Sequence, residues 1–249
     1  MQVFAKSDIG RERKTNEDFY YVSKPEDKIR LFILADGMGG YNAGEVASSI
    51  AVEIMKKTAE EAKPDMHAYD ILKKGVADAN SVIYSTAAME KRFSNMGTTI
   101  TAAMFDNNEL YIVNVGDSRA YLYSDGLLKQ ATQDHSYVQE LMNEGLLTKQ
   151  EADTHPQRNY ITRSLGVECE VEADIYCLPW KSGDRLLLCT DGLTQHLSDD
   201  EIRHILSSFS TPEFTADAFI KLANAHGGSD NITVIAVFND DMSSEGGNC

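Results

Sequence analysis

Residues 98–128 read TTITAAMFDNNELYIVNVGDSRAYLYSDGLL, and this stretch decides the fold. Its β-branched and aromatic runs predict three strands, at Thr98–Phe105, Glu109–Val115 and Arg119–Tyr123. Asp106-Asn107-Asn108 is predicted to form a turn between the first two strands, and Asp125-Gly126 after the third is typical of a tight hairpin turn. Connections this short join antiparallel strands, because parallel neighbours need a crossover of about a dozen residues or more.

The middle strand of the three is apolar on both faces. Leu110 and Ile112 point to one face of the sheet, and Tyr111, Val113 and Val115 point to the other. A strand of this kind lies between two layers, because a sheet with one solvated face alternates apolar and polar residues. We therefore expect an α+β fold, an antiparallel β-sandwich flanked on both sides by pairs of helices in a four-layer αββα arrangement. The tight turns disfavour a doubly wound parallel sheet.

The sequence on either side supplies the remaining elements. Further strands are predicted at Phe19–Val22, Ile29–Ala35, Val171–Leu178, Arg185–Thr190 and Ile232–Phe238. Long helices are predicted after the capping residue Asn42, over residues 66–91, after Ser198, and from Thr211-Pro212 onward. Ser136 and Thr148 each begin a capping-box pattern, which predicts two short helices in an insertion between strands. Met1–Gly10 is a mixed polar segment without the apolar core of a signal peptide.

The chain of 249 residues shows no linker, so we expect a single domain over residues 1–240. Residues 241–249 are polar and rich in Gly and Ser, and we expect them to form a flexible C-terminal tail.

The charge of the chain excludes several classes of partner. The 23 basic and 39 acidic residues give a net charge of −16, which disfavours binding to nucleic acid and to anionic membranes. No apolar run approaches the roughly 18 residues of a membrane span. The four cysteines form no Cys-x-x-Cys pair, so we expect reduced thiols rather than disulfides or thiolate metal sites. These features favour a cytoplasmic protein that binds neither nucleic acid nor membrane.

Four aspartates lie where apolar strands begin or end. Asp36-Gly37, Gly116-Asp117 and Asp191-Gly192 follow predicted strands, and Asp230-Asn231 precedes the last one. In an antiparallel sheet the end of one strand and the start of its neighbour share an edge, so the four carboxylates are expected to meet at one rim. The alternative is that each aspartate caps a turn, which is common for this residue.

A group of carboxylates with little His or Cys nearby suits Mg²⁺ or Mn²⁺, which prefer oxygen ligands. Glycine next to an aspartate lets its own carbonyl approach a metal closely. Two ions about 3.5–4 Å apart that share one carboxylate activate the water between them as a nucleophile. Arg11 and Arg13 are candidates to bind an anionic substrate, because a guanidinium holds phosphate bidentately. Alternatively, both are solvated surface charges.

At these residues the chain resembles a known family, the metal-dependent protein Ser/Thr phosphatases of type 2C in their short bacterial form. The motifs that carry the resemblance occur in order along almost the whole chain. They are Arg13-x-x-Asn16-Glu17-Asp18, Ala35-Asp36-Gly37-Met38-Gly39-Gly40, Gly97-Thr98-Thr99, Val115-Gly116-Asp117-Ser118-Arg119, Asp134-His135-Ser136, Ile161-Thr162-Arg163-Ser164-Leu165-Gly166, Cys189-Thr190-Asp191-Gly192-Leu193 and Ser229-Asp230-Asn231-Ile232-Thr233.

The resemblance implies a phosphatase that hydrolyses phosphoserine and phosphothreonine by attack of a metal-bridged water or hydroxide, with Mn²⁺ or Mg²⁺ as cofactor. It implies two tight ions held by Asp36, shared between them, by the Gly37 carbonyl, and by Asp191 and Asp230. It also implies that Asp117 holds a third, weaker ion, that Asp18 with Glu17 orders metal-bound water, and that Arg13 binds the phosphate. The insertion at about 136–163 corresponds to the family's mobile flap. The partners expected are phosphorylated proteins, including a eukaryotic-like Ser/Thr kinase, and a monomer is expected.

One position departs from the eukaryotic members of the family. They have His after the Asp-Gly of the first metal motif, as a proposed general acid, whereas this chain has Met38, whose thioether donates no proton. His135 is a candidate for that role. Two alternatives to the phosphatase stay open: a catalytically idle module that binds phosphoproteins, and another two-metal phosphoester hydrolase.

Overall fold

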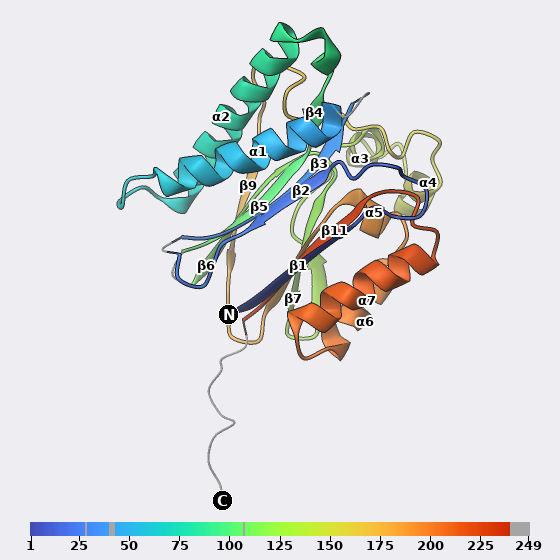
Figure 1. The fold of residues 1–249 in the computed structure, drawn as a ribbon. Coiled ribbons are helices and arrows are strands. Elements are labelled where there is room, and N and C mark those ends of the chain that lie inside the picture. The colour runs from blue at the N-terminus through green and yellow to red at the C-terminus, as the bar shows by residue number, and fades with distance from the viewer. Residues whose placement is uncertain (28, 40–42, 107, 240–249) are drawn as a thin grey trace, which may run out of the picture.

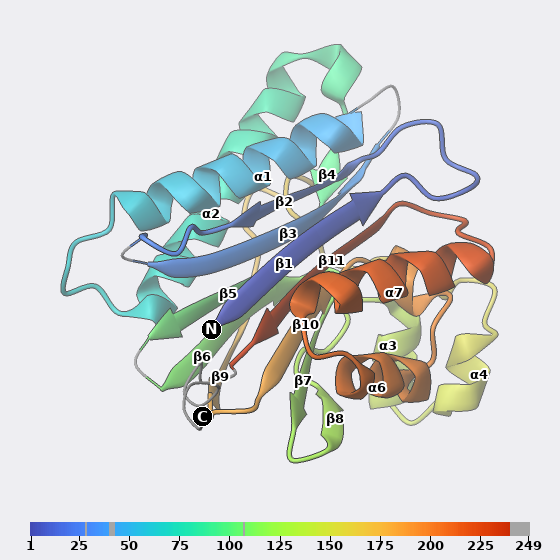
Figure 2. The same cartoon turned by 60° about the horizontal axis from the view of Figure 1, so that its bottom comes forward.

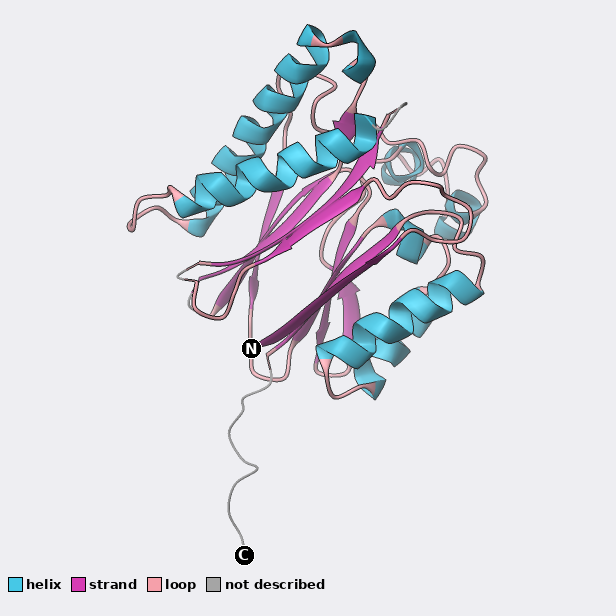
Figure 3. Ribbon diagram, in the orientation of Figure 1, coloured by secondary structure: helices cyan, strands magenta, loops and turns pink. Residues whose placement is uncertain are grey.

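The computed structural model describes residues 1–27, 29–39, 43–106 and 108–239. In this part of the chain two sheets lie face to face, and helices cover the outer face of each sheet (Figures 1 and 3). The expected tail at 241–249 and the predicted helix cap Asn42 fall outside the described residues.

The first sheet has five strands. Their order across the sheet is β1 (Gln2–Asp8), β11 (Ile232–Phe238), β10 (Arg185–Cys189), β7 (Arg119–Ser124) and β8 (Leu127–Gln130). Every neighbouring pair in this sheet is antiparallel. The hairpin predicted at Asp125-Gly126 joins β7 to β8, with Asp125 at a φ of 52°.

The second sheet has six strands and is also antiparallel throughout. Its order is β2 (Asp18–Val22), β3 (Arg30–Met38), β5 (Ile100–Asp106), β6 (Glu109–Val115) and β9 (Asp174–Pro179), with the short β4 (Gly97–Thr98) paired to the end of β3. As predicted, β5 pairs antiparallel with β6, and β7 pairs antiparallel with β8. β6 and β7, by contrast, belong to different sheets, so the short connection Gly116-Asp117-Ser118 crosses from one sheet to the other.

Helices pack on the two outer faces. α1 (Ala43–Glu60) and α2 (Ala68–Met89) cover the six-stranded sheet, whereas α6 (Asp199–Ser208) and α7 (Pro212–Ala225) cover the five-stranded sheet (Figure 2). The shorter helices are η1 (Lys91–Phe93), α3 (Tyr137–Asn143), α4 (Lys149–Asp153) and α5 (Asp191–Thr194). The four-layer α+β sandwich predicted from the sequence is confirmed.

Three apolar layers hold this stack together. The middle layer lies between the sheets and includes Phe32, Ile112, Leu188 and Val237, all fully buried. A second layer packs α1 and α2 against the six-stranded sheet, and a third packs α6 and α7 against the five-stranded sheet. The strands apolar on both faces are those that contribute to two layers at once.

The sequence did not predict β1. Its residues, QVFAKSD, mix polar and apolar side chains, and each is only half-buried because β1 is an edge strand that pairs with β11 alone. The predicted strand at Val171–Leu178 begins later, at Asp174, and residues 171–173 are irregular. Helix signals were more reliable: Thr148 and Ser198 form complete capping boxes, and Pro212 opens α7.

None of the helices in the described part of the chain is long and apolar enough to cross a membrane.

The middle layer makes a direct prediction about stability. Leu188→Ala should lower the free energy of unfolding by about 2–5 kcal/mol, because the lost side chain leaves a cavity between the sheets. Leu127→Ala is the control, since Leu127 is 73% exposed, and it should change stability by less than about 0.5 kcal/mol. Urea denaturation measures both, and equal losses would contradict the packing described here.

Candidate active site

The predicted aspartates converge at one end of the sandwich. Asp36 in β3 is the register partner of Asp18 in β2, so these two carboxylates lie on adjacent strands. Asp191 opens α5 directly after β10, and Asp230 lies just before β11, the neighbour of β10. Asp117 follows β6. The two sheets thus contribute carboxylates to the same rim.

The carboxylates are close enough to perturb one another. Burial, together with repulsion from Asp191 and Asp230, raises the pKa of Asp18 to about 7, although hydrogen bonds from Thr233 and Thr190 oppose the shift. Burial, with repulsion from Asp230, raises the pKa of Asp191 to about 6. The pKa of Asp36 is raised well above its ordinary value by burial and then by Asp18, Asp191, Asp117 and Asp230. Removing several carboxylates from water side by side is unfavourable unless a cation compensates them.

Three oxygens of this group have no hydrogen-bond partner. They are Oδ1 of Asp18, Oδ1 of Asp117 and Oδ1 of Asp191, and they make up three of the four such buried side-chain atoms in the described residues. Buried polar atoms are almost always paired, so orphaned carboxylate oxygens indicate a missing positive partner. An all-oxygen set of this kind fits Mg²⁺ or Mn²⁺.

The side chains alone do not complete a site. Among the described residues, no group of three or more Asp, Glu, His or Cys side chains is arranged to hold a metal ion. Ligands from the backbone and from water are therefore needed as well, and both ions in question accept them. Gly37, next to Asp36, is the backbone ligand that the family resemblance implies. A Cβ there would lie 2.0 Å from the carbonyl oxygen of Gly44. Only glycine fits at this position.

Threonines on neighbouring strands fix the two central carboxylate residues. The backbone N–H of Asp36 donates to Oγ1 of Thr99 at 3.0 Å, and Oγ1 of Thr98 donates to the Asp36 carbonyl at 2.9 Å. Oδ2 of Asp18 accepts from Oγ1 of Thr233 at 2.6 Å and from Oγ1 of Thr190 at 3.0 Å. Since Thr190 and Thr233 belong to the other sheet, Asp18 links the two sheets at the site.

Asn231 is a positioning residue that sequence reasoning missed. Its Oδ1 accepts from the backbone N–H of Glu17 at 2.8 Å, and its Nδ2 donates to the carbonyls of Ile9 and Thr15, both at 3.0 Å. It therefore ties the loop that carries Arg13 to the start of β11. Its place in the motif Ser229-Asp230-Asn231-Ile232-Thr233 was the signal that could have found it.

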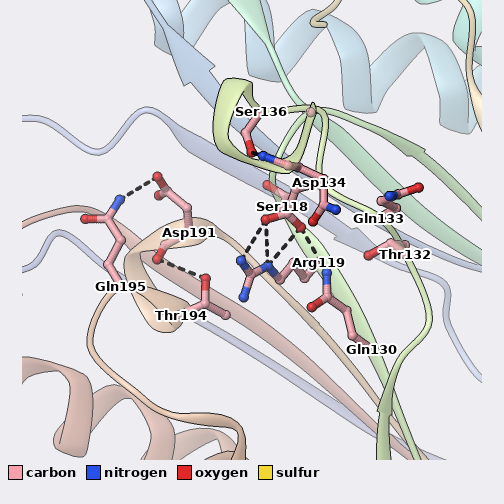
Figure 4. A network of polar contacts seen from close by, with 12 residues as sticks. Ser118, Arg119, Gln130, Thr132, Gln133, Asp134, Ser136, Asp191, Thr194 and Gln195 are labelled. Carbon is pink, nitrogen blue, oxygen red and sulfur yellow. Dashed lines mark hydrogen bonds and ion pairs between the residues drawn. The ribbon is translucent and has the colours of Figure 1, made fainter. Parts of the chain in front are cut away.

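Asp117 forms no ion pair with its near neighbour Arg119 in the described part of the chain. Arg119 instead makes a bidentate contact with Asp134, with Nε 2.9 Å from Oδ1 and Nη2 2.7 Å from Oδ2 (Figure 4). Asp117 is buried, and its Oδ1 has no hydrogen-bond partner among the described residues. Asp191, by contrast, accepts from Nε2 of Gln195 at 2.6 Å (Figure 4).

The structure distinguishes the two candidate arginines. Nη2 of Arg13 lies 2.7 Å from Oδ2 of Asp230, while the rest of this side chain stays exposed. Arg13 lines a cleft of about 1200 Å³, together with Asp36, Asp191 and Asp230. Arg11 is not among the residues that line this cleft.

His135, considered as a general acid, is buried and engaged at both ring nitrogens. Its Nδ1 accepts from the backbone N–H of Gly116 at 3.1 Å, which places the proton on Nε2. Nε2 lies 3.3 Å from Oδ2 of Asp174 and 3.1 Å from Nη1 of Arg163. Burial lowers the pKa of His135. This histidine fixes the turn before Asp117 and is not among the residues lining the cleft, so the structure gives the general-acid interpretation no support.

The sequence of this chain matches a known protein family. The sequence model of a family described as protein phosphatase 2C matches residues 10–230. The chain belongs to the protein phosphatase 2C family. This confirms the resemblance on which the residue assignments were based.

Individual relatives of this phosphatase agree. The serine/threonine phosphatase stp of Listeria monocytogenes is 42% identical over 243 residues, which are 96% of this chain and 96% of that protein. The crystal structure of the serine/threonine phosphatase PstP/Ppp of Mycobacterium tuberculosis has a TM-score of 0.89 at 40% identity, covering 96% of this chain and 99% of that one. A structure of the PstP catalytic domain in complex with two manganese ions has a TM-score of 0.86 at 39% identity, covering 96% and 98%. The expectation of a bacterial Ser/Thr protein phosphatase is confirmed.

The contacts of His135 predict how it responds to substitution. His135→Asn keeps an acceptor for the Gly116 N–H but has no acidic proton, so it should hydrolyse a phosphopeptide and p-nitrophenyl phosphate nearly as well as the wild type. His135→Leu leaves the Gly116 N–H without an acceptor and should lower the free energy of unfolding by about 1–3 kcal/mol. A selective loss of phosphopeptide turnover in His135→Asn would restore the general-acid role, because the poorer leaving group needs the proton more.

Proposed function

We propose that this phosphatase removes phosphate from phosphoserine and phosphothreonine in proteins, and that it uses divalent cations held at the aspartate rim. The observation that carries the proposal is the set of orphaned carboxylate oxygens of Asp18, Asp117 and Asp191, next to a cleft that Arg13 also lines. A site with excess buried negative charge has no means of binding an anionic substrate until cations neutralise it.

The residues assigned to the cations are those that the family resemblance implies. Asp36 would be shared by two ions, with the Gly37 carbonyl on one ion and Asp191 and Asp230 on the other. Asp117 would hold a third, weaker ion, and Asp18 with Glu17 would act through ordered water. Manganese is supported by the PstP structure that contains two manganese ions, and magnesium suits the same oxygen ligands. Bound cations would acidify water and withdraw charge from the phosphate ester.

Arg13 is assigned to the phosphate. Its contact with Asp230 uses one edge of the guanidinium and holds the side chain at the mouth of the cleft. The remaining N–H donors suit bidentate contact with phosphate oxygens. No side chain is assigned as general acid, since Met38 has no proton to donate.

The alternatives fit less well. An idle phosphoprotein-binding module would lack aspartates of the metal set, whereas this chain has all of them. A nuclease or other hydrolase of nucleic acid would need basic surface that a net charge of −16 does not supply. The physiological setting that we propose is a cytoplasmic monomer that acts on phosphorylated proteins, among them a Ser/Thr kinase that it opposes.

The function is tested by its metal dependence. After dialysis against a chelator, the protein should hydrolyse neither a phosphothreonine peptide nor p-nitrophenyl phosphate, and Mn²⁺ or Mg²⁺ in excess of the chelator should restore both activities. Undiminished turnover in chelator would contradict the proposed role of the aspartate rim.

Arg13→Ala should raise KM for phosphopeptides by about tenfold or more, because a charge-assisted contact with phosphate is worth about 1.5–3 kcal/mol. kcat should fall less, since the contact exists before the reaction as well as during it. Arg11→Ala is the matched control: it removes the same charge two residues away, outside the cleft, and should leave both constants unchanged. If Arg13→Ala and Arg11→Ala have the same KM and kcat, Arg13 does not bind the phosphate and is only a surface charge.

A further inference from the structure

The cleft continues well beyond the aspartate rim. Besides Arg13 and Asp36, it is lined by Tyr69, Lys73 and Val76 of α2 and by side chains from residues 167–175. We call the part between α2 and residues 167–175 the α2 groove. The whole cleft of about 1200 Å³ is larger than the roughly 300–1,000 Å³ of small-molecule sites. A phosphate group at the rim would therefore leave the α2 groove free.

The wall formed by residues 167–175 starts as an irregular segment, yet α2 holds it in place (Figure 1). Asn80 of α2 is 2% exposed and makes three hydrogen bonds to this segment. Its Oδ1 accepts from the Gly166 N–H at 2.8 Å, and its Nδ2 donates to the carbonyls of Glu168 at 3.1 Å and Cys169 at 3.2 Å. Gly166 has a φ of +88°, and a Cβ there would lie 2.2 Å from Ile83. The groove is thus a built feature rather than a loose loop.

The groove exposes apolar surface. Tyr69 and Val167 are large apolar side chains that are 42% and 56% exposed, and both line the cleft. Val171 and Ile175 line the same wall and are partly buried against the α2 core layer. Exposed apolar side chains gathered in one concave surface mark a binding site more often than scattered ones.

The charges at the groove select among possible occupants. Lys73 is one cation, and Arg163, which also lines the cleft, already pairs with Asp174 at 3.1 Å. Glu168, Glu170 and Glu172 are three carboxylates along the wall opposite α2. The side that faces an occupant is therefore acidic as well as apolar. A segment with an aliphatic side chain and a basic residue complements it, and a segment rich in Asp or Glu is repelled.

We propose that the α2 groove binds the polypeptide that flanks the phosphoresidue of the substrate, and that it favours aliphatic and basic flanking residues over acidic ones. The inference rests on the proposed function, because continuity with the aspartate rim is what makes the flanking polypeptide the occupant. Asn80 is a positioning residue in this account: it contacts no substrate and shapes the wall that does.

Two tyrosines of α2 provide a matched test. Tyr69 lines the groove, whereas Tyr84 does not line the cleft, and they are 42% and 41% exposed. On a phosphothreonine peptide with Leu and Lys in its flanks, Tyr69→Ala and Val167→Ser should each raise KM about tenfold, the loss expected for one buried apolar contact. p-Nitrophenyl phosphate has no flanking polypeptide, so its turnover should stay unchanged in both variants. Tyr84→Ala should match the wild type on both substrates.

Further variants separate the groove from the chemistry. Asn80→Ala should raise KM for the same peptide while turnover of p-nitrophenyl phosphate is retained. The wild type should have a lower KM for Lys-flanked than for Glu-flanked peptides. Glu170→Lys should bring these two KM values closer together. Equal KM for Tyr69→Ala and Tyr84→Ala, or a loss on p-nitrophenyl phosphate that equals the loss on the peptide, would overturn the groove assignment. Absence of metal-dependent turnover in the wild type would instead overturn the proposed function.

Discussion

Mutual repulsion among buried carboxylates is the constraint on which the rest of this structure depends. Asp18, Asp36, Asp117 and Asp191 lie close enough to raise one another's pKa, and three of their oxygens lack any hydrogen-bond partner. A protein keeps such an arrangement only if its scaffold is strong enough to hold the groups together and if binding a cation repays the strain. The fold supplies the scaffold, and the orphaned oxygens are the atoms proposed to bind the cation.

The scaffold meets the first condition by dividing the aspartates between two sheets. Each sheet is internally hydrogen-bonded, and the apolar middle layer fixes one sheet against the other. The hydroxyl groups of Thr190 and Thr233 donate hydrogen bonds to Asp18 and so connect the two sheets at the rim. The same architecture leaves the cleft open on the side of α2, so that the rim and the groove form one continuous surface.

Sequence reasoning succeeded where the signal was local. The tight turns after β5 and β7 implied antiparallel pairing. The strand-end positions of Asp36, Asp191 and Asp230 implied a common rim, and their roles as metal ligands stay predictions. It failed where the signal was tertiary. β1 owes its existence to pairing with β11, more than 200 residues away, because its own composition is not typical of a strand. The contacts of His135, likewise, depend on partners from three separate segments.

The central claim is that the aspartate rim is a divalent cation site, and Mn²⁺ titration of the wild type and Asp36→Asn tests it most directly. The wild type should bind two ions tightly, and its free energy of unfolding should rise by about 2.7 kcal/mol per site once free Mn²⁺ reaches 100 times its Kd. Asp36→Asn should fold but lose this tight binding, and without metal it should be at least as stable as the wild type, because one repelling carboxylate is gone. Equal Mn²⁺ binding and equal stabilisation of the two proteins would contradict the account.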